Sequence, residues 1–427
     1  MYNNSKRSSF GSQRRYGQSS GGHFGGPSFK SGQQRPSAGS RFGGGRPNGG
    51  GRGRGRANAF SKHIDPSLFI KKAEEFVKIE ETNTIHNFSD FNFHSVLYDN
   101  ITAKGYIKPT PIQDQTIEHI LKGRDILGIA NTGTGKTAAF ALPLINQILD
   151  NPKKMILIMA PTRELATQIK QEIRSFTFGM KVFVALAIGG SFIREQIIDI
   201  KRGPHFIIGT PGRIKDLGER RVIDFSKIDT IVLDEVDRML DMGFIEDIKS
   251  ILGRVPAQRQ TLFFSATVDR KVEGLIDTFL TNPVKISVKT QDSSSHVEQN
   301  VIRVDRHAKQ DMLGKLLSQE ELKKVLIFGA TKRMVEEITI TLIQKGFSAD
   351  SIHGDKPQHK RQRVMKMFKE SQLRILVATD VAARGLDIAD ITHVINYDIP
   401  NNYEDYIHRI GRTGRGNSKG FSLTFVS

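Results

Sequence analysis

The chain has 427 residues, of which 37% are hydrophobic, so it is long enough for about two to three domains with real cores. It has no cysteine, which excludes disulfides, thiolate metal sites and cysteine nucleophiles. Its formal net charge is +18, and residues 1–60 hold 11 basic and no acidic side chains, so the difference of +7 belongs to residues 61–427. This distribution predicts a polyanionic partner, and nucleic acid is favoured over an anionic membrane because no basic amphipathic helix is visible.

The chain also lacks the patterns of a membrane or secreted protein. No apolar run approaches the roughly 20 residues that span a bilayer, and the N-terminus has no apolar core of a secretion signal. We therefore predict a cytoplasmic protein without a membrane partner.

Residues 1–60 are mainly Gly, Ser, Arg, Gln and Asn with scattered aromatic residues, and they end in alternating Gly and Arg. This composition cannot bury a core and predicts a disordered basic tail. Arginines interleaved with aromatic rings suit phosphate contacts and stacking on unpaired bases, which favours weak, salt-sensitive RNA binding. A solubilising tail or flexible tether is the alternative. Residues 61–87 read as a linker with a short helical pattern over residues 66–77, and no chemistry is predicted there.

A glycine-rich loop follows a short apolar strand over residues 125–129 and precedes a helical pattern. Its residues are Ala130, Asn131, Thr132, Gly133, Thr134, Gly135, Lys136 and Thr137. The order of strand, loop and helix is that of a phosphate-binding loop, in which backbone N–H groups and a helix N-terminus surround phosphate oxygens. Lys136 is expected to reach the β- and γ-phosphates, and the Thr137 hydroxyl to bind Mg²⁺. An ordinary turn rich in Gly and Thr is the alternative for this stretch alone.

Apolar strand patterns alternate with helical patterns through residues 88–288. The strands are expected over residues 155–159, 182–187, 206–208, 231–233 and 262–264. This alternation predicts a parallel sheet covered by helices, and ligands of such sheets bind at the carboxyl ends of the strands.

Acidic and hydroxyl side chains follow two of these strands. Asp234 and Glu235 come directly after residues 231–233, so Asp234 is expected to hold Mg²⁺ through water and Glu235 to orient and deprotonate the attacking water. Ser265 and Thr267 follow residues 262–264, and their hydroxyls are candidates to hydrogen-bond the acidic loop. A solvated acidic loop and an uninformative hydroxyl pair are the alternatives.

A polar linker over residues 289–298 precedes a second α/β unit over residues 299–427, with strands expected over residues 324–328, 374–378, 392–396 and 421–426. This unit has no second Gly-Lys-Thr loop, but it is rich in arginine. Arg384 follows one strand, and three more arginines cluster around glycines over residues 408–415. These groups either bind RNA or reach the γ-phosphate of a nucleotide that the first unit holds.

With these motifs in view, residues 88–427 resemble a bacterial-type DEAD-box ATP-dependent RNA helicase of superfamily 2. The resemblance implies two tandem RecA-like domains, ATP and Mg²⁺ as cofactors, and RNA as the partner. Residues 105–113 are similar to the family's Q motif, which implies that Gln113 reads adenine and that the upstream Phe88 stacks on it. Tyr106 lies in the same motif and is assigned to the nucleotide site.

The resemblance extends to the remaining motifs. Residues implied to contact RNA are Arg163, Gly190, Thr210, Arg213, Thr331, Arg361 and Thr379. Gly385 and Asp387 are implied at the nucleotide, with Asp387 on the ribose, and Arg412 and Arg415 as arginine fingers. Coupling between the domains is assigned to Asp237, Ser265, Thr267, Arg384 and His408.

The implied mechanism is closure of two domains around ATP and single-stranded RNA, since only the closed form assembles the hydrolytic site. Bent RNA in the closed form excludes duplex geometry, so a short duplex opens locally, and hydrolysis then releases the strand. We expect a monomer, with ribonucleoprotein or RNA-degradation complexes as further partners.

At the first position of the phosphate loop, Ala130 stands where the general phosphate-loop pattern has a glycine. The sequence departs from the family pattern at two further places, and in the first of them Val236 stands where the acidic box usually has Ala. The chain also ends at Ser427, directly after the strand over residues 421–426, which suggests a fragment or a reduced second domain.

Three alternatives remain for the function. The first is a helicase or translocase acting on DNA, and the second is an ATP-gated RNA clamp or annealing chaperone in which the basic tail does most of the binding. The third is an unrelated ATPase with a basic tail.

Overall fold

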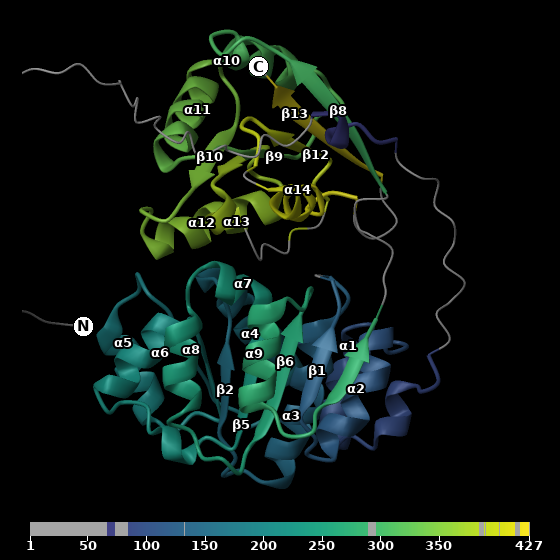
Figure 1. Cartoon of the computed structure of the whole chain (residues 1–427), viewed down its shortest axis with the longest axis vertical. Coiled ribbons are helices and arrows are strands. Elements are labelled where there is room, and N and C mark those ends of the chain that lie inside the picture. Colours follow the sequence, from purple (N-terminus) through teal and green to yellow (C-terminus); the bar gives the residue numbers. More distant parts are fainter. Residues whose placement is uncertain are drawn as a thin grey trace, which may run out of the picture. The chain divides into compact units, whose positions relative to one another are not determined.

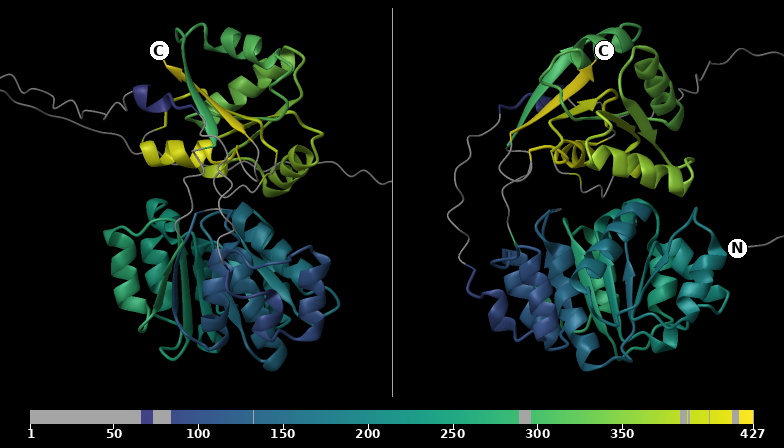
Figure 2. Two further views of the ribbon diagram at one scale, coloured as in Figure 1. Left: turned by 90° about the vertical axis from the view of Figure 1, so that its right-hand side faces the viewer. Right: turned by 180° about the vertical axis from the view of Figure 1, so that it is seen from behind.

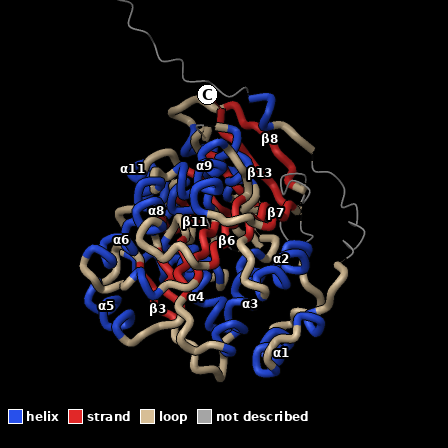
Figure 3. Tube along the Cα trace, turned by 60° about the horizontal axis from the view of Figure 1, so that its bottom comes forward, coloured by secondary structure: helices blue, strands red, loops and turns tan. Residues whose placement is uncertain are grey.

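The computed structural model describes residues 66–72, 84–131, 133–288, 296–383, 388, 390–400, 402–414 and 419–426. Within them the chain forms two parallel β-sheets, and each sheet has helices on both faces (Figures 1 and 2). Figure 3 shows the strands in red among the helices in blue. The prediction of two tandem α/β domains with parallel sheets is confirmed. The predicted tail, residues 1–60, lies outside the described residues.

The first domain contains a seven-stranded parallel sheet of order β3-β4-β2-β5-β6-β1-β7. Its strands are β1 (Ile126–Ile129), β2 (Ile156–Met159), β3 (Val184–Ala187), β4 (Phe206–Gly209), β5 (Thr230–Asp234), β6 (Gln260–Ser265) and β7 (Val284–Ser287). Its helices are η2 (Phe88–Phe91), α1 (Ser95–Ala103), α2 (Pro111–Leu121), α3 (Lys136–Asp150), α4 (Arg163–Phe176), α5 (Ile193–Lys201), α6 (Pro211–Glu219), η3 (Phe225–Lys227), α7 (Val236–Asp241), α8 (Ile245–Leu252) and α9 (Arg270–Phe279).

Two hydrophobic cores lie on opposite faces of this sheet, because successive residues of a strand point to opposite sides. In β1, Ile126 packs in the core shared with α1 to α4, whereas Leu127 packs in the core shared with α5 to α9. In β2, Ile158 likewise packs in the first of these cores and Leu157 in the second. Both faces are therefore fully covered, as near-continuous apolar strands require.

The second domain contains a six-stranded parallel sheet of order β10-β11-β9-β12-β13-β8. Its strands are β8 (Val297–Arg303), β9 (Val325–Phe328), β10 (Ala349–Ile352), β11 (Ile375–Ala378), β12 (His393–Asn396) and β13 (Gly420–Val426). Its helices are α10 (Lys309–Leu317), α11 (Lys332–Gln344), α12 (Gln358–Lys369), α13 (Asp380–Ala383) and α14 (Tyr403–Ile410). α10 and α11 cover one face, while α12 and α13 cover the other.

The strand order gathers the predicted functional loops into groups. The phosphate loop, the acidic loop and the Ser-Ala-Thr loop follow β1, β5 and β6, and these three strands are neighbours in the sheet. The predicted RNA-contacting residues of the first domain follow β2, β3 and β4, which are also neighbours. Because the strands are parallel, all these loops lie at one edge, with the groups predicted to bind nucleotide on one half and those predicted to bind RNA on the other.

Two details differ from the sequence prediction. β8 begins at Val297, inside the linker expected over residues 289–298, because its first residues pair with β13. The helical pattern over residues 66–77 forms a short 3₁₀-helix, η1 (Pro66–Phe69), and Lys71 then joins an antiparallel bridge; residues 73–77 lie outside the described residues. Among the described residues, no helix has the length and apolar composition needed to cross a bilayer.

Candidate nucleotide and RNA sites

The phosphate loop joins β1 to α3 and turns at two glycines. Gly133 and Gly135 both have a φ of +89°, which residues with a side chain rarely adopt. Lys136 begins α3, and its buried ammonium group donates a hydrogen bond of 2.9 Å to the carbonyl oxygen of Ala130. The lysine thus folds back over the loop, where a bound phosphate would replace the carbonyl as its partner. Thr132 lies outside the described residues.

Gln113 ties α2 to the phosphate loop. Its side chain is 1% exposed; Oε1 accepts a hydrogen bond of 2.9 Å from the backbone N–H of Thr110, and Nε2 donates one of 3.1 Å to the carbonyl oxygen of Gly135. A Cβ atom on Gly135 would lie 2.4 Å from Nε2, so the close approach of α2 is a second reason for glycine there. An amide group can donate twice and accept twice, which leaves Gln113 the capacity to pair with a base.

The predicted adenine-stacking residue lies in an aromatic cluster. Phe88 is 2% exposed and packs edge-to-face on Tyr106, with ring centroids 6.0 Å apart. Tyr106 in turn packs edge-to-face on Phe176 at 5.6 Å. Stacking of Phe88 on adenine stays a prediction, and it requires the ring to become more exposed than it is in this structure.

Asp234 ends β5 and is 3% exposed. Burial raises the pKa of Asp234 to about 7, an effect that the nearby charge of Lys136 partly offsets. A buried carboxylate that one lysine does not fully compensate fits a Mg²⁺ ion, which proteins usually hold through one or two carboxylates and the substrate phosphates. Thr137, in the first turn of α3, offers the hydroxyl of the same predicted site. Among the described residues there is no cluster of three or more His, Asp or Glu that could enclose a metal ion.

Glu235 occupies a strained backbone position between β5 and α7. Its φ of 54° and ψ of 56° are left-handed, which costs a residue with a side chain roughly 1–3 kcal/mol. The side chain is 3% exposed, and its Oε2 lies 3.7 Å from Nε of the equally buried Arg238. Val236 is completely buried and belongs to the hydrophobic core that also contains residues of α8 and α9, so its extra methyl groups pack inside the domain.

The acidic loop and the Ser-Ala-Thr loop are joined by hydrogen bonds, as the sequence suggested. Asp237 Oδ2 accepts hydrogen bonds from Thr267 Oγ1 at 3.0 Å and from the backbone N–H groups of Ala266 and Thr267 at 3.0 and 2.8 Å. Ser265 Oγ accepts a bond of 3.3 Å from the backbone N–H of Asp237. The contact is therefore confirmed, while the role of these residues in coupling the domains stays a prediction.

The arginine cluster of the second domain divides into different roles. Arg409 is 3% exposed, and its Nε and Nη2 donate to the two carboxylate oxygens of Asp380 at 2.6 and 2.8 Å. Its Nη1 donates to Asn396 Oδ1 at 3.1 Å, so Arg409 anchors α14 on α13 and β12. Arg412 is also buried, and its Nε donates to the carbonyl oxygen of His408 at 3.2 Å. Arg384, Gly385, Asp387 and Arg415 lie outside the described residues.

The predicted RNA-contacting residues of the first domain sit close together. Arg163, the first residue of α4, lies against two glycines of the loop after β3: a Cβ atom on Gly190 would come within 2.2 Å of its Nη1. Arg213 of α6 donates a hydrogen bond of 3.1 Å to Gln196 Oε1. Thr210 is the N-cap residue of α6. Backbone, hydroxyl and guanidinium groups of this kind suit a grip on sugar and phosphate without reading the bases.

In the second domain, Thr331 caps α11, where its Oγ1 accepts a hydrogen bond of 3.2 Å from the N–H of Met334. Thr379 follows β11, and its carbonyl oxygen accepts hydrogen bonds from Ala382 and Ala383 of α13. A cavity of about 420 Å³ is lined by residues of both domains: Pro161, Thr162, Arg163, Glu164, Gly189, Thr210, Gly212, Arg213, Asp216, Met242, Phe244, Gly354, Arg361 and Val381.

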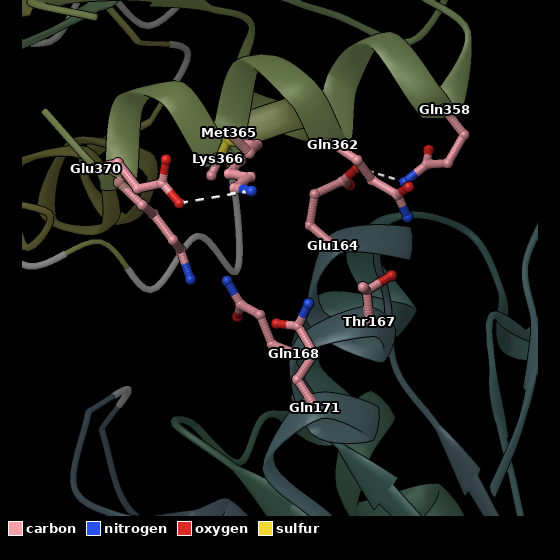
Figure 4. A pocket seen from close by; sticks show the side chains of 10 residues that line it. Glu164, Thr167, Gln168, Gln171, Gln358, Gln362, Met365, Lys366 and Glu370 are labelled. Atoms are coloured by element: carbon pink, nitrogen blue, oxygen red, sulfur yellow. Dashed lines mark hydrogen bonds and ion pairs between the residues drawn. The ribbon is translucent and has the colours of Figure 1, made fainter. Parts of the chain in front are cut away.

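Arg361 makes an ion pair that sequence reasoning missed. Its Nη2 lies 2.7 Å from Oε2 of Glu164, and both side chains are buried (6% and 7% exposed). Gln358, one helical turn earlier on α12, donates from Nε2 to the other oxygen of Glu164 at 3.2 Å (Figure 4). Burial lowers the pKa of Arg361, although Glu164 opposes this. Glu164 and Gln358 stand inside the two motifs whose arginines were assigned to RNA, and their presence there is the only sequence signal for this contact.

The chain is similar to known helicases in sequence and in structure. Residues 110–275 match the DEAD/DEAH box helicase model, and residues 308–417 match the helicase conserved C-terminal domain model. The ATP-dependent RNA helicase CshA of Listeria monocytogenes is 45% identical over 341 residues, which are 79% of this chain and 66% of that protein. The DEAD-box ATP-dependent RNA helicase CshA of Bacillus licheniformis is 44% identical over 342 residues, 80% of this chain and 70% of that protein.

Among solved structures, S. cerevisiae Dbp5 bound to RNA and ADP BeF₃ superposes with a TM-score of 0.71 and 30% identity, covering 79% of this chain and 89% of that chain. This likeness confirms that the two α/β domains are RecA-like. The chain spans just under two thirds of the length of the first of these relatives, CshA of L. monocytogenes. From the arrangement of its loops and from these matches, the chain belongs to the family of DEAD-box ATP-dependent RNA helicases.

Proposed function

We propose that this chain binds ATP and single-stranded RNA together, hydrolyses ATP in response to RNA, and opens short duplexes locally. The observation that carries the proposal is the burial of Lys136, Asp234 and Glu235 where the chain leaves β1 and β5, two strands that stand close together in the first sheet. A cation for phosphate, a carboxylate for a divalent ion and a carboxylate for water are the groups that phosphoryl transfer requires. The CshA relatives are named ATP-dependent RNA helicases, and Dbp5 was solved with RNA and a nucleotide.

In the proposed reaction, Lys136 holds the β- and γ-phosphates at the phosphate loop. Glu235 accepts a proton from the water that attacks the γ-phosphorus, and the bond to the β-γ bridging oxygen breaks to release ADP and phosphate. Thr137 and Asp234 would hold Mg²⁺, which supplies positive charge at the phosphate oxygens when it is bound. Arg412 and Arg415 are proposed to stabilise the charge that develops on the γ-phosphoryl group, and Asp387 with Gly385 to hold the ribose side of the nucleotide.

On the RNA side, the first domain offers Arg163, Gly190, Thr210 and Arg213, and the second offers Thr331, Arg361 and Thr379. We propose that these groups bind the backbone without regard to sequence and that the bent strand excludes a partner strand. Asp237, Ser265, Thr267, Arg384 and His408 are proposed to make hydrolysis depend on both ligands. Coupling of this kind is reciprocal, so ATP should raise the affinity for RNA by the same factor by which RNA raises the affinity for ATP. A monomeric state, a cytoplasmic location and further ribonucleoprotein or RNA-degradation partners stay predictions.

Gln113→Ala tests the assignment of adenine reading. We expect the KM for ATP to rise roughly 10- to 100-fold, because a bidentate amide contact with adenine is worth about 1–3 kcal/mol. The preference for ATP over GTP should fall with it. Steady-state hydrolysis of both nucleotides at saturating RNA measures the two effects. The exposed Gln171 of α4 gives the control Gln171→Ala, and an unchanged ratio of ATP to GTP in Gln113→Ala would contradict the assignment.

A second candidate function is an ATP-gated RNA clamp or annealing chaperone, which the basic composition of residues 1–60 favours. Removal of residues 1–60 separates the two functions, because those residues hold 11 of the 18 net positive charges but none of the proposed hydrolytic groups. We expect the shortened chain to keep RNA-stimulated ATP hydrolysis and strand separation while its RNA affinity becomes weaker and less salt-dependent. Fluorescence anisotropy measures the RNA affinity and its salt dependence, and a duplex-opening assay measures strand separation. Loss of nearly all RNA binding, with ATP hydrolysis no longer responsive to RNA, would favour the clamp.

A further inference from the structure

A short segment that precedes the ATP-binding domain in sequence is packed on the second domain. Phe69 of η1 is completely buried in a small hydrophobic core with Val297 of β8 and with Tyr406 and Ile410 of α14. Its ring lies 4.4 Å from the ring of Tyr406, measured between centroids. Phe69 thus joins a core whose other members come from more than 200 residues later in the chain.

The backbone of this segment extends the second sheet. β8 is an edge strand, and Lys71 forms an antiparallel bridge with Gln299 on its open side. The N–H of Lys71 donates to the carbonyl oxygen of Gln299 at 3.1 Å, and the N–H of Gln299 donates to the carbonyl oxygen of Lys71 at 2.7 Å. Addition of a peptide to an exposed strand edge is a common mode of recognition, in which the backbone gives affinity and a buried side chain gives specificity.

The same contact reaches α14 through a polar link. The hydroxyl of Tyr406 donates a hydrogen bond of 3.0 Å to Oε1 of Gln299, and Gln299 is 2% exposed. Burial raises the pKa of Tyr406 to about 12, so the hydroxyl stays protonated as this donor at neutral pH. Gln299 of β8 therefore contacts the segment through its backbone and α14 through its side chain.

α14 carries His408, which is proposed to couple ATP hydrolysis to RNA, and is followed by Arg412, which is proposed to act on the γ-phosphoryl group. Tyr406 and Ile410 are spaced four residues apart and share the helix face that Phe69 covers. His408 lies between them in sequence, and Arg412 follows the helix and bonds back to the carbonyl oxygen of His408. Movement of the covered face would move His408 and Arg412 with it, because they are fixed to the same helical turn.

We propose that Pro66–Lys71 is an intramolecular clip that docks on β8 and α14. Docking holds α14, and with it His408 and the adjoining Arg412, in the position that ATP hydrolysis needs. Phe69 is then a positioning residue, since it touches neither nucleotide nor RNA. Residues 72–87 link the clip to the ATP-binding domain, so the clip provides a second covalent connection between the domains besides residues 288–296. Such a tether keeps the local concentration of the clip high and favours docking of a short segment. The positioning role rests on the proposed ATP hydrolysis, whereas the docking does not.

The test compares three variants of the full chain. Phe69→Ala removes the aromatic ring of Phe69 from the small core. Lys71→Pro removes the backbone N–H that donates to Gln299 and leaves the residues of the core unchanged. Ile70→Ala is the matched control, because Ile70 is 62% exposed in the same segment. Hydrogen exchange read by mass spectrometry on peptides from β8 and α14 reports docking, and steady-state ATP hydrolysis at saturating RNA reports positioning. Circular dichroism verifies that each variant is folded.

We expect amide exchange in β8 and α14 to rise about tenfold or more in Phe69→Ala and Lys71→Pro, since local opening sets exchange. The kcat should fall about tenfold in both, because a shift of about 1 Å in a catalytic group can cost as much as ~100-fold. Ile70→Ala should match the unaltered chain in both measurements. Unchanged exchange in the first two variants would overturn docking, and faster exchange with an equal or higher kcat would overturn the positioning role. Failure of the proposed function itself would look different, because the unaltered chain would then lack RNA-stimulated hydrolysis.

Discussion

Glu235→Gln should reduce RNA-stimulated ATP turnover by about 10²- to 10⁴-fold, the usual contribution of a positioned general base. Glutamine has nearly the same shape, so it should keep the left-handed backbone between β5 and α7, but it cannot accept the proton of the attacking water. Binding of ATP and of RNA should persist, because Lys136 and the loops that are proposed to bind RNA are unchanged. Single-turnover hydrolysis at saturating RNA, with separate titrations of both ligands, measures these effects.

The matched control for that substitution is Glu246→Gln on α8, whose side chain is 79% exposed in the same domain. It should leave turnover unaltered. If Glu235→Gln retained a third or more of the turnover, Glu235 would not be the general base, and the assignment of the acidic loop would fail.

Arg409→Ala should destabilise the second domain by about 3 kcal/mol, because it breaks a bidentate, largely buried ion pair. Asp380 would lose both hydrogen bonds that the Arg409 guanidinium group donates to it, and Asn396 would lose one hydrogen bond. Urea unfolding followed by circular dichroism should therefore show an earlier transition for this domain. The chain has no tryptophan, so an intrinsic tryptophan signal is absent and the backbone signal serves instead.

Arg333→Ala provides the comparison for Arg409→Ala. Arg333 pairs with Glu337 on the surface of α11, where its side chain is 89% exposed. Exposed pairs of this kind contribute little, so the unfolding midpoint should stay where it is. Equal shifts in the two variants would show that the Arg409 pair does not anchor α14.

The sequence predicted most strands because they are buried on both faces and read as short apolar runs. β2, β5, β9 and β11 are completely buried, and all were expected within two residues of their observed bounds. β10 was not expected, because Asp350 and Ser351 interrupt its apolar pattern. β7 was not expected either: it is an edge strand with one fully buried residue, Ile286, so it lacks the apolar run of a central strand.

The candidate site was predictable where the chemistry is local. The phosphate loop and the acidic box are continuous motifs, and the strand order that brings them together follows from parallel topology. Contacts between distant residues were not predictable in the same way. Arg409 was one of three similar arginines in the sequence, and only the fold shows that Asp380 holds it.

Glu164 and Phe69 are two further residues whose contacts could not be predicted from the sequence. Glu164 lies beside an arginine in its motif, yet its partner is Arg361, almost 200 residues away. Phe69 stands in a linker with only a short helical pattern, so nothing local distinguishes it from the exposed Ile70. Pairing of this kind depends on tertiary structure, which single-sequence patterns do not encode.

Steady-state ATP hydrolysis by the full chain, measured with and without single-stranded RNA, shows whether the protein is an RNA-stimulated ATPase. We expect slow hydrolysis without RNA and a clear rise in kcat as RNA reaches saturation, with Glu235→Gln giving the background rate. The RNA dependence follows from the proposed site, which needs groups of both domains because Arg412 and Arg415, after α14, are proposed to act together with Lys136 and Glu235. ATP hydrolysis that is absent, or equal with and without RNA, would show that this chain is not an RNA-dependent ATPase.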